Sequence, residues 1–353
     1  MSHHCVVFLP QRSGKRTMSD INEKTRIPGV LVANLGPPDA PERKPVARFL
    51  REFLSDPRVV DLPRFLWLPL LNLVIIPLRA GRSAAAYREI WWPEGSPLLV
   101  LTERLADRLR LLVGGRWPVE IGMRYRKPSI RRGLRTLRDA GVHDLVVLPL
   151  YPQFSGTTTA SIYDGVETAL RDLNWNPRLH RVDEYHVHPA WVEAIAQSVR
   201  AYRAKHGAAE KLMFSLHGIP QRYVRQGDPY QQQCEESVRA VVQALGLADD
   251  EWLLTYQSRV GREPWLQPYT DITLEELAKS GTRHVQVLCP GFAVDCLETL
   301  EEIAMQNSEL FEEAGGDKLE YIPALNDSET HARLLEHLVT EALATPGGEM
   351  DSA

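Results

Sequence analysis

Short runs of apolar, often β-branched residues alternate with longer amphipathic stretches along most of the chain. The short runs predict strands at residues 30–35, 119–123, 145–150, 212–216, 252–255 and 285–288. The longer stretches repeat apolar residues at helical spacing and predict helices at residues 97–112, 129–140, 162–173, 190–206 and 229–245. Strands that alternate with helices are typical of an α/β protein with a parallel sheet.

The strand pattern occurs twice, once before about residue 180 and once after it. We therefore predict two similar Rossmann-like lobes, each a parallel sheet flanked by helices, with an active-site cleft between them. The expected divisions are a disordered lead-in at 1–26, lobes at 27–180 and 181–325, a helix at 326–345 that packs back on the first lobe, and a disordered tail at 346–353. Ligands of such sheets bind beyond the carboxyl ends of the strands, so the loops there are expected to carry the function.

An uncharged apolar stretch at 65–78 interrupts this alternation. A membrane-spanning helix needs about 20 apolar residues, and Pro69 and Pro77 are expected to break a helix that is already too short. Two interpretations stay open. The stretch is either a buried helix or, with Trp67 and flanking arginines, an apolar lip at 62–82 that rests on a membrane surface.

Composition and charge narrow the function classes. With 44% hydrophobic and 25% charged residues the chain is globular, and a net charge of −5 predicts no nucleic-acid partner. The four cysteines form no C-x-x-C pair, which favours a reducing cytoplasm over a disulfide framework or a zinc ribbon. Neither a dinucleotide-binding nor a triphosphate-binding glycine motif is present.

His217 follows a predicted strand directly and has Gly218 behind it to let the chain turn. This is where a parallel-sheet protein places a catalytic base. A histidine at a strand end can equally be a structural hydrogen-bonding group, and its position alone leaves both interpretations open.

A carboxylate-rich segment at 289–302 predicts a strand, a turn and a helix. Asp295, Glu298 and Glu302 stand at i, i+3 and i+7, so an α-helix would carry all three on one face. Such a column suits a transient, weakly held divalent cation. Paired carboxylates also occur in glycosidases, but nothing nearby resembles a sugar-binding platform. Acidic residues in a first turn also suit the helix dipole, which can explain Asp295 and Glu298 without any catalytic role but does not explain Glu302.

Five motifs in order give the chain a family resemblance. They occupy residues 31–39, 149–155, 215–220, 257–261 with 264–266, and 289–302. On these motifs the chain resembles ferrochelatases from about Gly29 to Ala344, in particular the bacterial type that uses protoporphyrin. The resemblance implies a lyase that inserts Fe²⁺ into protoporphyrin IX to form protohaem, in the last step of haem biosynthesis.

The same resemblance implies roles for single residues. His217 and Glu298 would be catalytic and would contact the metal, and Asp295 and Glu302 would continue a path for protons or metal. Porphyrin-binding positions would be Leu35, Arg79, Arg82, Ser96, Arg124, Tyr125, Tyr185 and Trp265. Iron is the substrate, so no organic cofactor is expected, and the absence of cysteine after Leu338 predicts no iron–sulfur cluster.

The expected location is the cytoplasm, with peripheral contact on the inner face of the membrane through the lip. The sequence does not indicate an oligomeric state. Two alternatives stay open: a related chelatase that uses coproporphyrin III or another metal, and a non-catalytic porphyrin or haem carrier. Three carboxylates beside the imidazole disfavour the carrier, because charged groups are costly to bury without a function.

Overall fold

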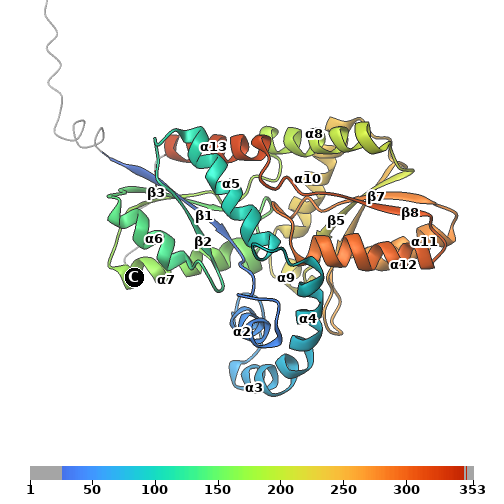
Figure 1. Cartoon of the computed structure of the whole chain (residues 1–353), viewed down its shortest axis with the longest axis horizontal. Coiled ribbons are helices and arrows are strands. Elements are labelled where there is room, and N and C mark those ends of the chain that lie inside the picture. Colours follow the sequence, from blue (N-terminus) through green and yellow to red (C-terminus); the bar gives the residue numbers. More distant parts are fainter. Residues whose placement is uncertain (1–25, 346, 348–353) are drawn as a thin grey trace, which may run out of the picture.

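Two four-stranded parallel sheets form the centre of the molecule (Figure 1). The computed structural model describes residues 26–345 and residue 347, so the predicted disordered ends fall almost wholly outside the described residues. The sheet orders are β2-β1-β3-β4 and β6-β5-β7-β8, which are the same order repeated. The predicted α/β class with two parallel sheets is confirmed. The strands are β1 Pro28–Asn34, β2 Val119–Met123, β3 Asp144–Pro149, β4 Arg178–Arg181, β5 Lys211–His217, β6 Trp252–Gln257, β7 His284–Leu288 and β8 Lys318–Ile322.

Two of these strands, β4 and β8, were not predicted. Both lie at a sheet edge, and β4 is short and polar, while β8 begins with an exposed lysine. An edge strand is paired on one side only and is often short and charged, so it lacks the continuous apolar run of a central strand. The six apolar runs all became strands, including the edge strands β2 and β6, whose apolar runs are longer than that of β4.

Helices cover both faces of each sheet, and two of them exchange lobes (Figure 1). Helix α8 follows β4 but packs on α10 of the second lobe, while α13 follows β8 and packs on α5 of the first. Their bounds, with those of the other regular helices, are α2 Arg43–Leu54, α5 Pro97–Val113, α6 Ile130–Asp139, α7 Ser161–Leu173, α8 Pro189–His206, α9 Gln221–Arg225, α10 Tyr230–Leu245, α11 Thr270–Lys279, α12 Ser308–Glu313 and α13 Glu329–Ala344.

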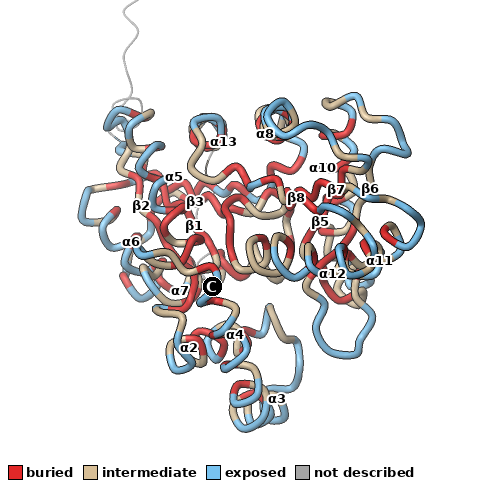
Figure 2. The backbone as a smooth tube through the Cα atoms, turned by 45° about the vertical axis from the view of Figure 1, so that its right-hand side comes forward, coloured by how far each residue is buried: buried red, intermediate tan, exposed pale blue. Residues whose placement is uncertain are grey.

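One apolar cluster runs through both lobes. It includes Val32 of β1, Leu105 of α5, Trp191 of α8, Phe214 of β5 and Leu335 of α13, all buried. In Figure 2 the strands of the two sheets form a continuous buried band. Burial of one large apolar side chain stabilises the fold by about 1.5–3 kcal/mol, so this shared core holds the two lobes as one body.

The apolar stretch is helical throughout. Helix α3 (Arg64–Leu70), the π-helical turn η1 (Leu71–Ile75) and α4 (Ile76–Ile90) follow one another without a break. The prediction that Pro69 and Pro77 would break the helix is therefore wrong. Pro69 lies in the exposed α3, where water can bond to the carbonyl that the proline leaves unpaired. The wider η1 turn precedes Pro77, and a π turn accommodates a residue that donates no N–H.

The helix exposes much of its apolar surface at the protruding end. Phe65 is 78% exposed, Leu73 76% and Leu78 65%, and α3 has no buried residue. Figure 2 shows α3 as an exposed projection below the sheets. The buried-helix interpretation is wrong for this end, although α4 packs on α2 through its inner face. By length and composition alone, the 27 residues Arg64–Ile90 could cross a membrane, with a mean hydropathy of 1.3 and 17% burial in their most apolar window.

Candidate active site

His217 is the last residue of β5, a central strand of the second sheet. Its Nδ1 lies 2.6 Å from the carbonyl oxygen of Gly218. A carbonyl only accepts hydrogen bonds, so Nδ1 carries the hydrogen and the neutral ring keeps a lone pair on Nε2. The ring is half-buried, with the rings of Trp265 and Phe292 centred 6.3 and 6.4 Å away. The imidazole is therefore held in the tautomer that a general base requires.

The carboxylate segment follows β7 and forms a π-helix, η3 (Glu298–Asn307), rather than the predicted α-helix. Because η3 begins at Glu298, Asp295 precedes the helix and is not on a shared face. The prediction of a column of three carboxylates is wrong for Asp295. Glu302 remains a neighbour of Glu298, since residues four apart lie on nearly the same side of a π-helix.

Asp295 is buried and its carboxylate accepts four hydrogen bonds. The donors are the Tyr321 hydroxyl at 2.6 Å, the Asn326 amide at 2.7 Å, the Thr299 hydroxyl at 3.0 Å and the Ala324 backbone N–H at 3.3 Å. A carboxylate with this many donors is fully occupied. Asp295 therefore anchors the segment that leads into η3.

Glu302 lies where β6 meets η3. Its carboxylate accepts hydrogen bonds from the backbone N–H of Ser258 at 2.7 Å, the Ser258 hydroxyl and, at 3.3 Å, the Gln257 amide. Burial raises the pKa of Glu302; the Ser258 hydrogen bond and the His217 charge oppose the rise, and the Glu298 charge adds to it. Glu302, Glu298 and His217 thus share one electrostatic environment.

Two tyrosines from other parts of the chain lie near enough to Glu298 to be affected by its charge. Burial raises the pKa of Tyr87, on α4, and of Tyr151, in the loop after β3, and the Glu298 charge raises both further. Cys296 is also close to Glu298. Burial raises the pKa of its thiol, and the Glu298 carboxylate raises it further. Sequence reasoning named none of these three as site residues. Tyr151 falls within the motif at 149–155, but no local pattern singles out Tyr87.

The structure brings Leu35, Arg124 and Tyr125 together. The backbone N–H of Arg124 donates to Asn34 O at 2.8 Å and that of Tyr125 to Leu35 O at 2.9 Å, so the two chain segments continue side by side beyond β1 and β2. Gly36 permits this approach, because its φ is +93° and a Cβ there would lie 2.1 Å from the Tyr125 carbonyl oxygen. Leu35 and Tyr125 belong to the same apolar cluster as Leu297 and Leu300, which lie on either side of Glu298 in the sequence. These four residues are called the apolar wall.

The other predicted porphyrin-binding residues are spread over the fold. Arg79 and Arg82 lie on α4, and neither has an ion-pair partner within residues 26–345. Burial lowers the pKa of Arg79, and the positive charge of Arg82 lowers it further. Trp265 lies beside His217. Ser96 and Tyr185 are only 3% and 4% exposed, and Tyr185 packs in the core that both lobes share.

In the described part of the chain, no group of three or more His, Cys, Asp or Glu side chains is placed so that it could hold a metal ion.

The family model for ferrochelatase matches residues 28–343. The chain is 53% identical to the ferrochelatase of Methylococcus capsulatus over 317 residues, which cover 90% of this chain and 97% of that protein. It is 50% identical to the ferrochelatase of Vibrio cholerae over 311 residues, which cover 88% and 97%.

Among solved structures, SirB from Bacillus subtilis with Fe³⁺ superposes with a TM-score of 0.55 at 9% identity, covering 91% of this chain and 99% of SirB. The sirohydrochlorin chelatase SirB from Bacillus subtilis subspecies spizizenii, in complex with cobalt, gives 0.52 at 9% identity, covering 91% and 97%. These two structures share the fold of this chain. The family model and the sequence relatives assign its family. The chain therefore belongs to the ferrochelatase family and is a lyase.

Proposed function

We propose that this ferrochelatase inserts Fe²⁺ into protoporphyrin IX to form protohaem, in the cleft centred on His217 and Glu298. The observation that carries the proposal is the imidazole of His217, with its lone pair on Nε2, in one electrostatic environment with Glu298 and Glu302. Leu35, the half-buried residue of the apolar wall beside Tyr125, suits contact with an apolar macrocycle. The reaction is the last step of haem biosynthesis.

The chemistry requires removal of two pyrrole protons and coordination of Fe²⁺ by the four ring nitrogens. His217 Nε2 accepts a pyrrole proton as general base. Glu298 and Glu302 receive protons or guide the cation, and the raised pKa of Glu302 suits a proton acceptor. Asp295 serves this path indirectly, because it anchors the segment before η3.

The porphyrin has two carboxylate side chains that need cationic partners. Arg79 and Arg82 on α4 suit this role, since neither has an ion-pair partner in the described structure. Trp265 supplies an aromatic surface beside His217. A planar macrocycle hides its nitrogen lone pairs, so rigid walls that bend it would favour metal insertion.

The direct test is an assay of the purified protein with Fe²⁺ and protoporphyrin IX, in which haem formation is followed by absorbance. We expect turnover without an organic cofactor or an iron–sulfur cluster, and slower turnover with coproporphyrin III. Porphyrin binding without haem formation would refute the proposal in favour of a carrier, and faster turnover with coproporphyrin III would change the assigned substrate.

We also propose that the enzyme works in the cytoplasm with the lip against the inner face of the membrane. The lip is defined as residues 62–82, and its outer apolar side chains include Phe65, Leu66, Leu73 and Leu78, all more than half exposed. Trp67 does not contribute an interfacial indole, because its Nε1–H donates to the Leu54 carbonyl at 2.7 Å. The apolar substrate would then reach the cleft directly from the bilayer.

Replacing Phe65 and Leu73 together with glutamate should weaken liposome binding and raise the KM for protoporphyrin. Both side chains are exposed, at 78% and 76%, so folding stability should change by little, within about ±0.5 kcal/mol for each substitution. Liposome co-sedimentation and steady-state kinetics measure the effect. Leu111→Glu is the matched control, since Leu111 is 81% exposed on α5, away from the lip. Co-sedimentation equal to that of the parent would contradict membrane contact through the lip.

A further inference from the structure

Asp56 is a buried carboxylate between the end of α2 and the lip. Its side chain is only 4% exposed, and it lies outside the five motifs that carry the family resemblance. Nothing in the surrounding sequence distinguishes it from an ordinary turn aspartate. Its side-chain partners are distant along the chain, so only the folded structure shows which side chains it contacts.

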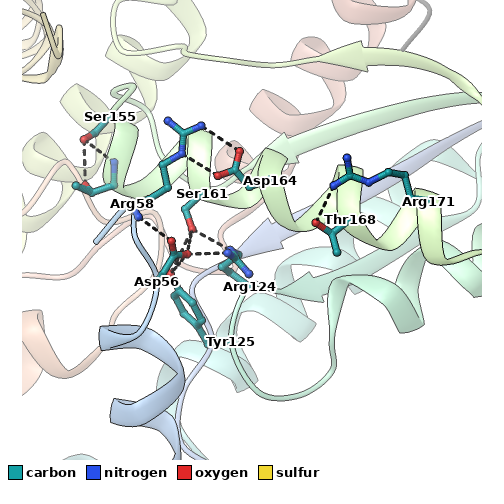
Figure 3. A network of polar contacts seen from close by, with 10 residues as sticks. Asp56, Arg58, Arg124, Tyr125, Ser155, Ser161, Asp164, Thr168 and Arg171 are labelled. Carbon is teal, nitrogen blue, oxygen red and sulfur yellow. Dashed lines mark hydrogen bonds and ion pairs between the residues drawn. The ribbon is translucent and has the colours of Figure 1, made fainter. Parts of the chain in front are cut away.

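One oxygen of this carboxylate, Oδ2, accepts three side-chain hydrogen bonds (Figure 3). The donors are Arg124 Nη2 at 2.6 Å, the Ser161 hydroxyl at 2.7 Å and the Tyr125 hydroxyl at 2.8 Å. The other oxygen, Oδ1, accepts from the backbone N–H of Arg58 at 2.8 Å. Burial alone would raise the pKa of Asp56, but the hydrogen bonds from Ser161, Arg58 and Tyr125, with the Arg124 charge, lower it. The group is therefore ionised and fully bonded near neutral pH.

These contacts hold the Arg124 guanidinium at two points. Nη2 bonds to Asp56, and Nε donates to the Ser161 hydroxyl at 2.8 Å. The guanidinium also lies 5.1 Å from the centre of the Tyr125 ring. A planar guanidinium with two bonded donors has a fixed orientation. No hydrogen bond from Nη1 occurs in the described part of the chain, and Arg124 is 24% exposed, so this edge remains available to a ligand.

Tyr125 is held by the same carboxylate. Its hydroxyl donates to Asp56, while its ring packs edge-on against Phe53 at 5.3 Å and joins the apolar wall with Leu35. A tyrosine fixed at both its ring and its hydroxyl cannot change rotamer without breaking a buried hydrogen bond. Asp56 thus holds two neighbouring residues, Arg124 through its guanidinium and Tyr125 through its hydroxyl.

We propose that Asp56 is a positioning residue for porphyrin binding: it fixes Arg124 and Tyr125 so that the macrocycle sits in the orientation that metal insertion requires. This inference rests on the proposed function together with the family resemblance, which implies that Arg124 and Tyr125 contact the porphyrin. Both oxygens of the Asp56 carboxylate already accept hydrogen bonds from the protein, so Asp56 acts through Arg124 and Tyr125 rather than by bonding to the macrocycle. Its effect is transmitted through the guanidinium and the phenol, and small displacements of positioning groups strongly affect catalysis.

The test is Asp56→Asn, which keeps the size of the side chain but removes its charge. An amide cannot satisfy four donors, because one of its two ends is itself a donor. We expect the KM for protoporphyrin to rise on the order of tenfold and the absorption spectrum of bound porphyrin to shift. Asp164→Asn is the matched control. Asp164 is a half-exposed carboxylate that pairs with Arg58 at 2.8 Å and contacts neither Arg124 nor Tyr125, so its KM should equal that of the parent.

A double-mutant cycle with Arg124→Ala shows whether Asp56 acts through Arg124. If it does, adding Asp56→Asn to Arg124→Ala should raise the KM by much less than it does in the parent. If Asp56→Asn fails to fold, Ser161→Ala is the second test. This substitution keeps the carboxylate but removes one of the two hydrogen bonds that hold Arg124, so it should still raise the KM for protoporphyrin.

If the parent protein makes haem, an unchanged KM in folded Asp56→Asn, or additive losses in the double-mutant cycle, would overturn the positioning role. Absence of haem formation by the parent would instead refute the proposed function.

Discussion

His217→Ala is expected to reduce metal insertion roughly 10²–10⁴-fold, the range that a positioned general base contributes. The structure gives the reason, because Nδ1 is occupied by the Gly218 carbonyl and the lone pair lies on Nε2. Alanine has no group that can accept a pyrrole proton there. The fold should tolerate the change at a cost of about 1 kcal/mol, since the ring is half-buried and its one hydrogen bond is to the adjacent residue.

Haem formation, thermal unfolding and porphyrin fluorescence quenching separate these effects. Added imidazole should partly restore turnover in His217→Ala, because a free base can enter the space that the side chain leaves. A merely structural histidine would not respond to imidazole. His206→Ala is the control, since His206 is exposed at the end of α8 and stacks on Tyr202. Near-parent turnover in folded His217→Ala would exclude His217 as the base.

Glu298→Gln is expected to lower kcat on the order of a hundredfold or more while porphyrin still binds. Glutamine keeps the shape of the side chain and the start of η3, where the Glu298 carbonyl accepts the Gln257 amide at 2.8 Å. It removes the negative charge that contributes to the raised pKa values of Tyr87 and Tyr151. A neutral amide can neither take up a proton nor guide a cation, so the loss should fall on turnover.

Glu301→Gln is the control on the same helix, where the Glu301 carboxylate accepts the Gln306 amide at 2.6 Å. Its kcat should match that of the parent. Glu302→Gln should lower kcat less than Glu298→Gln, but it should also destabilise the fold by about 1–3 kcal/mol, because its carboxylate accepts three donors from Gln257 and Ser258. Unchanged kcat in Glu298→Gln would refute the proton or metal path. Lost porphyrin affinity at unchanged turnover of the bound complex would move Glu298 from catalysis to binding.

The local sequence determined the class of the fold and most of its elements. Apolar runs placed six strands, and the helix predicted at 97–112 is α5, Pro97–Val113. Periodicity is encoded by neighbours within about one turn or one strand, so it needs no knowledge of the fold. It failed at the edge strands β4 and β8, because β4 is a four-residue polar segment and charged residues interrupt the apolar residues of β8. The strand-end position of His217 could likewise be read directly from the sequence.

Tertiary structure decided what the local pattern could not. The spacing of Asp295, Glu298 and Glu302 assumes an α-helix that starts at Asp295, whereas η3 is a π-helix that starts at Glu298 and leaves Asp295 in contact with Tyr321 and Asn326. The continuity of the helix through Pro69 and Pro77 depends on the η1 turn and on solvent at its exposed end.

The polar network around Asp56 depends entirely on the fold. Asp56 bonds to Arg124, 68 residues away, and to Ser161, 105 residues away. No sequence window contains both partners, and each residue alone is ordinary for its local position. Contacts of this kind form only when the sheet order brings the loops after β1 and β2 against the start of α7. The sequence therefore determined which residues could carry the chemistry, and the packing of elements within each lobe decided which of them meet and how each is oriented.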